Sequence, residues 1–492
     1  MATPARTEEQ GPAPGASGAV AARPDGRPAA AVPAPRPARA PGRLDLAGRA
    51  ARIADARHTA PGRLRLAGAL LAVLAVAFGL LTAWQVHTRA QAADRVVSYS
   101  QPLSQAAADI HRSLADADTT AATGFLLAGA EPRAVRERYE QDLATAARLI
   151  AEAAARTTAS SPAQQWLSSL NQQLPTYAGL VETARANNRQ GFPLGGAYLR
   201  YASQQMRDTL LPDAAKLADA ENQALARDYA EARAVPWAAY GLGLVVLAAL
   251  VQVQRVLFRR TNRVFNIGLV GATAAVLAAL LWLTAGSLIA SGRLADSERD
   301  GAAPLRALNV ARIDVLTARL AENLHLVARG SSTRYAELWA TTTKDLAGPA
   351  AAAGAPAAGN APAVGGALGE ARRLAPRDAA EAVEQAGQNY ATWSARHDAA
   401  MAKETADGDY QGALDATITV READVPNTSD ASFSITDQQL ERAAGIELAR
   451  FKASATGTGG LLDALSAGAG VLALLAAVSA VRGLGRRLAE YR

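Results

Sequence analysis

The sequence predicts an all-α membrane protein with four transmembrane helices and two extracytoplasmic helical-bundle domains in tandem. Half of the residues are hydrophobic but only 5% are aromatic, and much of the hydrophobic share is alanine, the strongest helix former. Four apolar stretches are long enough for a helix to cross about 30 Å of hydrocarbon. Two long regions between them show the three- and four-residue periodicity of amphipathic helices.

The four apolar stretches cover residues 66–84, 237–253, 266–289 and 461–481. No acidic or basic residue lies in the middle of any of them, since Arg255 follows the second and Asp463 lies at the outer end of the fourth. We interpret the first stretch as an uncleaved anchor. It follows some 65 residues of chain and is longer than a signal-peptide core of about 7 to 15 residues.

Arginine clusters predict the orientation, because short cytoplasmic segments are enriched in Lys and Arg. Eleven arginines and five acidic residues precede the first span, four arginines and no acid separate the second and third, and four arginines follow the fourth. Both termini are therefore expected in the cytoplasm, in a multi-pass protein of the plasma membrane. The candidate contacts for a cytoplasmic partner or membrane lipid are Arg255, Arg259, Arg260, Arg263, Arg486 and Arg487.

This topology divides the whole chain into tails, spans and bundles. In order, the predicted segments are a disordered Pro/Ala/Arg-rich cytoplasmic tail (1–62), transmembrane helix 1 (63–86), the first bundle (87–235), transmembrane helix 2 (236–257), a basic link (258–264), transmembrane helix 3 (265–290), the second bundle (291–459) with a low-complexity loop (348–368), transmembrane helix 4 (460–481) and a basic tail (482–492).

Glycine and proline near 129–132, 160–162 and 191–193 divide the first bundle into four helices, which predicts an up-and-down four-helix bundle of coiled-coil type. The second bundle shows the same plan. A short sequence similarity suggests an internal duplication. Residues 125–129 with the later Arg138-Tyr139 are similar to residues 324–330 with the later Arg334-Tyr335. Chance similarity between two alanine-rich bundles is the alternative.

No residue pattern predicts catalysis, a cofactor or a metal site. The chain has no cysteine, its five histidines lack metal-binding spacing, and it holds no phosphate loop or nucleophile elbow. The arginines flank apolar segments and do not interleave with aromatics, which argues against nucleic acid. Carboxylates at helical spacing are interpreted as solvated faces: Glu137, Glu140, Asp142 and Glu322.

The spans themselves argue against a channel or permease, because transport proteins usually keep paired ionisable residues inside the membrane. They carry instead small residues at helix-packing spacing, such as Gly268 with Ala272 and Ala464 with Gly468. Such pairs favour close helix contact, within one chain or across a homodimer.

Several short runs go beyond periodicity. The run Ala321-Glu322-Asn323-Leu324-His325-Leu326-Val327-Ala328-Arg329-Gly330, the run Leu210-Leu211-Pro212 and the closing Arg487-Leu488-Ala489-Glu490-Tyr491-Arg492 resemble the actinobacterial GlnX-type transmembrane sensors. The resemblance covers nearly all of the chain after the tail. It departs from the family's pattern at Leu324-His325-Leu326, where a more polar run is expected, and in the long loop after Gly348.

The resemblance implies two partners, a GlnH-type solute-binding lipoprotein outside the cell and a soluble PknG-type Ser/Thr kinase inside. It transfers no ligand-binding residue. The expected function is a non-enzymatic transmembrane signal transducer, a receptor that reads the ligand state of an amino-acid-binding lipoprotein and signals to the kinase. The alternative is an envelope scaffold that supports structure or assembly.

Overall fold

A computed structural model describes residues 60–127, 131–261, 266–349, 364–418, 427–455 and 458–489. The predicted tail up to residue 59 and the centre of the low-complexity loop lie outside these residues. All the elements assigned within the described ranges are helices, and Ala60–Arg492 form one compact unit.

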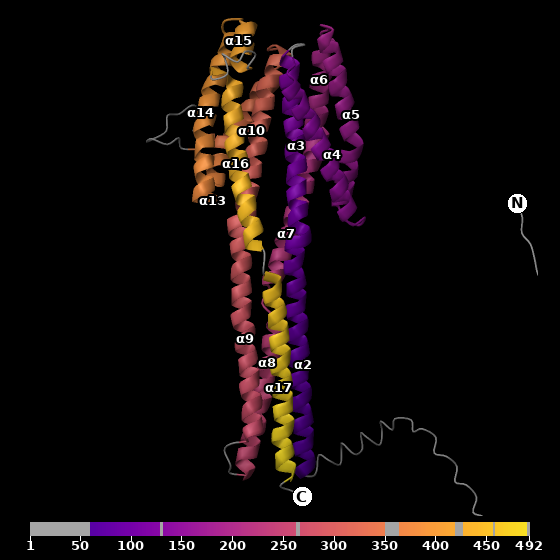
Figure 1. Cartoon of the computed structure of the whole chain (residues 1–492), viewed down its shortest axis with the longest axis vertical. Coiled ribbons are helices and arrows are strands. Elements are labelled where there is room, and N and C mark those ends of the chain that lie inside the picture. Colours follow the sequence, from indigo (N-terminus) through magenta and orange to yellow (C-terminus); the bar gives the residue numbers. More distant parts are fainter. Residues whose placement is uncertain are drawn as a thin grey trace, which may run out of the picture. The chain divides into compact units, whose positions relative to one another are not determined.

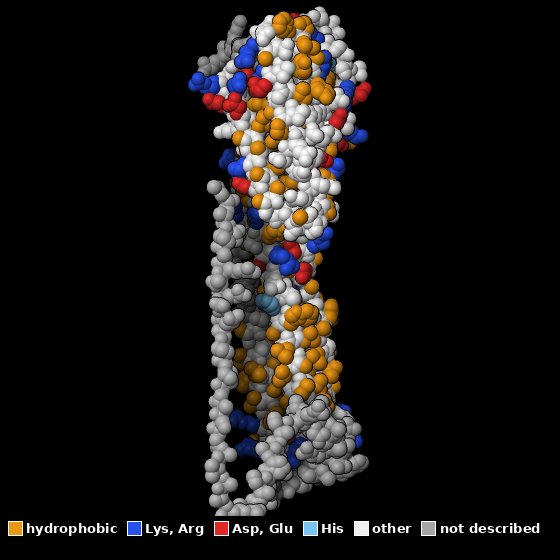
Figure 2. Space-filling view, turned by 90° about the vertical axis from the view of Figure 1, so that its right-hand side faces the viewer, with side chains coloured by type: hydrophobic (Ala, Val, Ile, Leu, Met, Phe, Trp, Pro, Cys, Tyr) orange, Lys and Arg blue, Asp and Glu red, His pale blue; other side chains and the backbone are white. Residues whose placement is uncertain are grey.

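Four of the helices are long and apolar enough to cross a membrane, which indicates a multi-pass membrane protein. Each predicted apolar stretch lies in one of them: α2 (Ala60–Arg95), α8 (Trp237–Thr261), α9 (Ile267–Ser297) and α17 (Thr458–Ala489). These spanning helices lie together at one end of the unit (Figure 1). Large apolar side chains such as Leu80, Leu281 and Leu474 point outward and are 60–71% exposed, as lipid-facing residues would be. Figure 2 shows hydrophobic side chains covering this part, whereas charged ones gather on the bundles and at the junction.

Small residues bring the spanning helices into close contact. A Cβ atom added to Gly268 of α9 would collide with the backbone of Gly483 in α17, and one added to Gly468 would collide with Trp282. The Asn266 side chain also donates to the Gly483 carbonyl at 2.9 Å. The packing predicted for Gly268 and Gly468 is therefore a contact within one chain.

The first bundle consists of α3 (Gln101–Leu126), α4 (Arg133–Arg156), α5 (Ala163–Arg189), α6 (Leu194–Gln205) and α7 (Leu211–Arg233). Because η2 (Met206–Leu210) joins α6 to α7, these elements form four rods. The rods are separated at the three places where glycine and proline predicted breaks.

The second bundle has more pieces. It consists of α10 (Ala303–Ala328), α11 (Arg334–Ala347), α13 (Gly366–Leu374), α14 (Arg377–Thr405), α15 (Tyr410–Thr417) and α16 (Ser429–Ala455). The two bundles lie side by side at the same end of the spanning helices (Figure 1). Their cores join where α3 packs against α10, because Leu320 and Leu324 of α10 belong to the core of the first bundle.

The first bundle helix of each half, with the π turn before it, repeats with an offset of 202 residues. The helix α3 begins at Gln101 and ends at Leu126, and α10 begins at Ala303 and ends at Ala328. The π-helical turns that precede them, η1 (Val96–Ser100) and η3 (Glu298–Ala302), keep the same offset. This register supports an internal duplication more strongly than the short sequence similarity does.

Proline explains the π-helical turns. Pro102, Pro212 and Pro304 each lie in the first two positions after such a turn. Proline has no N–H to donate within the helix, and its ring collides with the carbonyl one turn earlier. The wider π turn accommodates the ring without ending the helix. As a result, 62–126 and 267–328 each run without a break from a spanning segment into a bundle.

Candidate functional site

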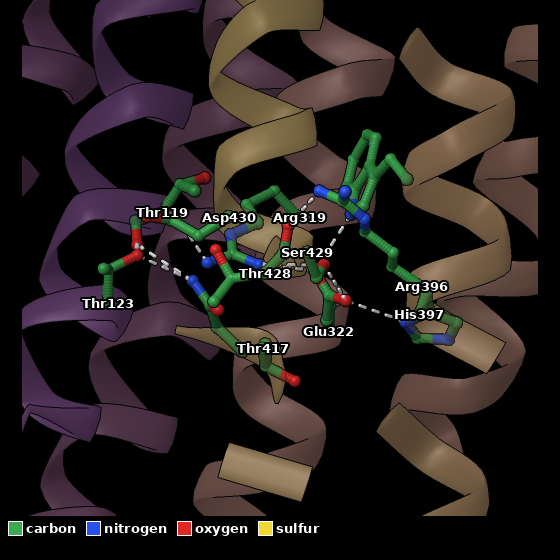
Figure 3. Close-up of polar contacts among 12 residues, drawn as sticks. Thr119, Thr123, Arg319, Glu322, Arg396, His397, Thr417, Thr428, Ser429 and Asp430 are labelled. Atoms are coloured by element: carbon green, nitrogen blue, oxygen red, sulfur yellow. Dashed lines mark hydrogen bonds and ion pairs between the residues drawn. The ribbon is translucent and has the colours of Figure 1, made fainter. Parts of the chain in front are cut away.

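The most unusual feature of the second bundle is a fully buried carboxylate, Glu322 of α10 (Figure 3). One turn earlier, Arg319 donates to it at 2.6 Å. From α14, Trp393 donates its indole N–H to Oε2 at 3.1 Å and His397 lies 3.1 Å from Oε1. From α16, the Ser429 hydroxyl donates to Oε1. One carboxylate thus ties three helices together.

The charges around Glu322 keep it ionised. Burial by itself would raise its pKa, but the positive charge of Arg319 and the hydrogen bonds and charge from His397 lower the pKa to about 2. Arg319 is also fully buried and makes a second ion pair with Asp430 at 2.8 Å. The cluster therefore holds a compensated set of charges inside the bundle.

Aromatic rings fix the position of His397. The Trp339 ring of α11 stacks on the imidazole with centroids 3.5 Å apart and an angle of 13° between the planes. Trp393 meets Trp339 edge to face at 5.2 Å. Movement of α11 or α14 would therefore displace a hydrogen-bond partner of Glu322.

The residue that follows Glu322 connects the two bundles. Asn323 donates to the Thr123 hydroxyl of α3 at 2.9 Å, and the Thr119 hydroxyl donates to the Leu316 carbonyl of α10 at 3.1 Å. Figure 3 shows Thr119 and Thr123 beside the charge cluster. The charge cluster and the bundle contact therefore lie on adjacent positions of one helix.

A charged bridge adds a second connection between the bundles. Arg138 of α4 donates to Asp116 of α3 at 2.9 Å and reaches Asp437 of α16 at 3.5 Å. Arg312 of α10 donates to the same Asp437 at 3.2 Å. Both aspartates are 5% exposed, so the bridge is largely shielded from solvent.

The first bundle contains a different buried acid, Asp118, which accepts hydrogen bonds from Tyr177 at 3.1 Å and Ser203 at 2.7 Å. Burial raises the pKa of Asp118 to about 6. With the 202-residue offset, Asp118 corresponds to Leu320 and Glu322 corresponds to Thr120. The two bundles therefore share an architecture but differ in the chemistry of their cores.

At the junction with the spanning helices, α7 is attached to α2. The buried Arg89 donates to the Ala232 carbonyl at 3.2 Å, in the last turn of α7, where a cation is favourable. Arg95 pairs with Asp228 at 3.1 Å and with Glu231 at 2.6 Å.

The same helix is attached to the second half of the chain. Tyr229 of α7 hydrogen-bonds Ser297 of α9 at 3.1 Å, and Arg233 pairs with Glu298 of η3 at 2.7 Å. A displacement of α7 would thus act on both α2 and α9.

The predicted arginine contacts lie away from these clusters. Arg255 and Arg259 of α8 and Arg486 of α17 are exposed, near the ends of their helices that point away from the bundles. The side chains of Arg260, Arg263 and Arg487 lie outside the described residues. Arg255, Arg259 and Arg486 therefore do not contact the buried polar clusters.

The interpretation of the scattered carboxylates was partly wrong. Glu137 and Glu140 are exposed as predicted, whereas Glu322 is fully buried and Asp142 is half-buried. Burial and the charge of Asp116 raise the pKa of Asp142 to about 7. A signal was present for Glu322, because α10 is apolar on nearly all sides near its end, as in 315–328, and such a helix is usually buried. Within the described residues, no three His, Asp or Glu side chains converge as metal ligands would.

Comparison with known families identifies the first of the two bundles. Residues 92–230, from the last turn of α2 to near the end of α7, match the actinobacterial sensor domain family. The second half of the repeat lies outside this match. Comparisons with curated proteins and with solved structures found no match. The chain therefore carries a sensor domain of actinobacterial type in its first bundle.

Proposed function

We propose that this protein is a non-enzymatic transmembrane signal transducer whose paired bundles act as the sensing part. The observation that carries the proposal is the continuity of 62–126 and 267–328, which pass without a break from the bundle contact into segments apolar enough to cross a membrane. A helix moves as a rigid rod, so a shift or rotation at one end reaches the other. The sensor domain supports this role for the first bundle.

The resemblance to GlnX-type sensors supplies the proposed partners. The bundles lie outside the cell and read the ligand state of an amino-acid-binding lipoprotein, and both termini lie in the cytoplasm, where a Ser/Thr kinase is recruited. The exposed Arg255, Arg259 and Arg486 support this orientation, because basic residues are enriched on the cytoplasmic side. They are also the candidate contacts for the kinase or for anionic lipid.

A reversible lock between the bundles tests the proposal. The side chains of Thr123 and Asn323 meet at 2.9 Å across the α3–α10 contact, and the chain has no native cysteine. In cells that lack the native gene, Thr123→Cys combined with Asn323→Cys is expected to abolish the regulated response to amino acids when oxidised. Reductant is expected to restore the response.

Each single cysteine variant is the matched control and should keep the response. Gentle-detergent purification of the full chain should recover a binding lipoprotein or a kinase. If deletion of the gene leaves the amino-acid response intact and causes an envelope defect under all nutrients, the protein is a scaffold and the proposal fails.

A further inference from the structure

A cavity of about 550 Å³ that the polar clusters do not use lies between α3, α7 and α10. It lies against the start of both repeated helices, because Gln101, which opens α3, and Ala302, which ends η3, both line it. Its volume lies in the range of small-ligand sites. Both halves of the duplicated chain therefore contribute to one cavity beside the π-helical turns.

The cavity wall carries charged groups without partners. Asp314 of α10 is half-buried, and no described residue donates a hydrogen bond to its carboxylate or pairs with it. Burial and the charge of Asp345 raise the pKa of Asp314 to about 7. His111, on the facing helix α3, has its pKa lowered to about 4 by burial and is neutral at physiological pH. A cationic group of a ligand would relieve the cost of ionising Asp314.

The opposite charge lies near the other end of the cavity. Arg306 lines the cavity and is exposed, and it forms no ion pair with a described acid. It precedes Asp314 by eight positions on the same helix, which corresponds to about 12 Å along the axis. A single amino acid cannot reach both, because its ammonium and carboxylate are separated by about 3 Å.

Amide side chains also line the cavity. Gln101 is only 8% exposed, and its amide has no hydrogen-bond partner among the described residues. Gln105 and Asn309 also line the cavity, and Asn222 accepts a hydrogen bond from Ser104 at 2.7 Å. Amide side chains both donate and accept, as the peptide groups of an extended chain require. Asp219 and Gln223 of α7 also line the cavity, so the wall holds a second carboxylate besides Asp314. Alanine and other apolar residues form most of the remaining wall.

We propose that this cavity binds a short peptide of about three residues, whose ammonium group meets Asp314 and whose carboxylate meets Arg306. An extended tripeptide spans about 10 Å between its charged ends, which matches the separation along α10. Its backbone groups would bond to the amide side chains that line the cavity. The idea that this peptide is the sensed signal rests on the proposed function, whereas the binding itself does not.

Binding of trialanine to the purified full chain tests the inference by isothermal titration calorimetry. N-acetyl-trialanine lacks the ammonium and trialanine amide lacks the carboxylate. Each is expected to bind roughly tenfold to a hundredfold more weakly than trialanine, because each loses one charge-assisted contact. Free alanine is expected to bind more weakly still.

Variants assign each charged end. Asp314→Asn should weaken trialanine binding by the same factor but leave N-acetyl-trialanine unaffected. Arg306→Gln should likewise weaken trialanine binding but leave the binding of trialanine amide unaffected. The matched controls are Asp109→Asn on the exposed side of α3 and Arg299→Gln of η3, which do not line the cavity and should change nothing. Thermal unfolding of each variant identifies any that are misfolded.

Equal binding of the capped and free peptides, or no binding of trialanine at millimolar concentration, would overturn the inference. Tight binding of alanine alone would overturn the assigned length. These outcomes are separate from the proposed function. A chain that binds trialanine while its deletion leaves the amino-acid response unchanged keeps the site and loses the signalling role, and the converse result removes only the site.

Discussion

At the scale of single residues, the two bundles contain buried acids of opposite behaviour. Glu322 has a low pKa because Arg319, His397 and Ser429 surround it with charge and hydrogen-bond donors. Asp118 has a raised pKa because its burial outweighs the hydrogen bonds from the Ser203 and Tyr177 hydroxyls and the charge of Arg207. Neutral donors compensate burial less well than a paired cation does.

Removing the charge of Glu322 is expected to destabilise the second bundle. Glu322→Gln leaves the buried Arg319 with Asp430 as its remaining ion-pair partner, and breaking a buried pair in this way costs about 3 kcal/mol. Denaturant unfolding followed by tryptophan fluorescence reports on this directly, because Trp393 touches the site. Glu337→Gln on the exposed face of α11 is the control, with an expected change below about 0.5 kcal/mol. Equal stability of the two variants would show that the cluster does not stabilise the fold.

The raised pKa of Asp118 predicts a pH dependence of stability. The folded pKa of about 6 lies above the ordinary value of 3.8, so the folded state binds the proton more tightly than the unfolded state. Stability from this group therefore rises as pH falls from about 6 to about 4, by up to about 3 kcal/mol.

Asp118→Asn should remove that pH dependence. The measurement is the unfolding midpoint of the wild type and of the variant across this pH range. Glu322 acts in the opposite direction, because its stabilising contribution is lost as pH falls below 4.5, its ordinary pKa. The quantity compared is therefore the difference in stability between wild type and variant at each pH. A constant difference across the range would contradict the assignment.

At the scale of elements, the π-helical turns η1 and η3 mark the passage from spanning helix to bundle. They occur at equivalent places in both halves, each followed by a proline, Pro102 or Pro304. Local helix geometry is therefore set by proline, while the continuity of the helix is kept.

Replacing these prolines should convert the π turns to regular helix. In Pro102→Ala and Pro304→Ala, the restored N–H donates within the helix. Hydrogen exchange of amides 96–101 and 298–303 is expected to slow by about fivefold, since a net hydrogen bond contributes about 1 kcal/mol. Pro162→Ala is the control, because Pro162 precedes the first turn of α5, where no hydrogen bond is lost. Unchanged exchange in both turns would mean that proline is not their cause.

Close packing of α9 on α17 gives a second prediction at this scale. Gly268→Ala places a methyl group against the backbone of Gly483 and should destabilise the spanning helices by about 1 to 3 kcal/mol. Gly470→Ala, also in a spanning helix, meets open space and should be neutral or stabilising by up to about 1 kcal/mol. Thermal unfolding in detergent compares the two. A loss of stability in Gly470→Ala equal to that in Gly268→Ala would exclude the packing argument.

At the scale of the whole molecule, the orientation in the membrane can be tested with single cysteines, since the chain has none of its own. Ala151→Cys and Ala399→Cys lie on exposed positions of the two bundles. A membrane-impermeant maleimide applied to intact cells is expected to label both. Arg486→Cys should be labelled only after permeabilisation, because its basic surroundings favour the cytoplasmic side. Labelling of Arg486→Cys in intact cells would reverse the topology.

Much of the fold followed from local sequence, and little of the candidate site did. The four apolar stretches and the breaks near 129–132, 160–162 and 191–193 are local signals, and the helices follow them. The sequence indicated the repeat only weakly, because short similar runs are common by chance in alanine-rich helices. The 202-residue offset is visible in the pairs Pro102-Leu103 and Pro304-Leu305.

The sequence alone determined which segments are helical and which are apolar enough to enter a membrane, because both properties depend on residues close together in the chain. The tertiary structure decided which charges are buried. Glu322 and Glu337 both lie at helical spacing among alanines and leucines, yet only Glu322 faces helices that lie some 70 to 110 residues later in the chain. Burial depends on what covers a helix face, and the covering residues Trp393, His397 and Ser429 are remote in sequence.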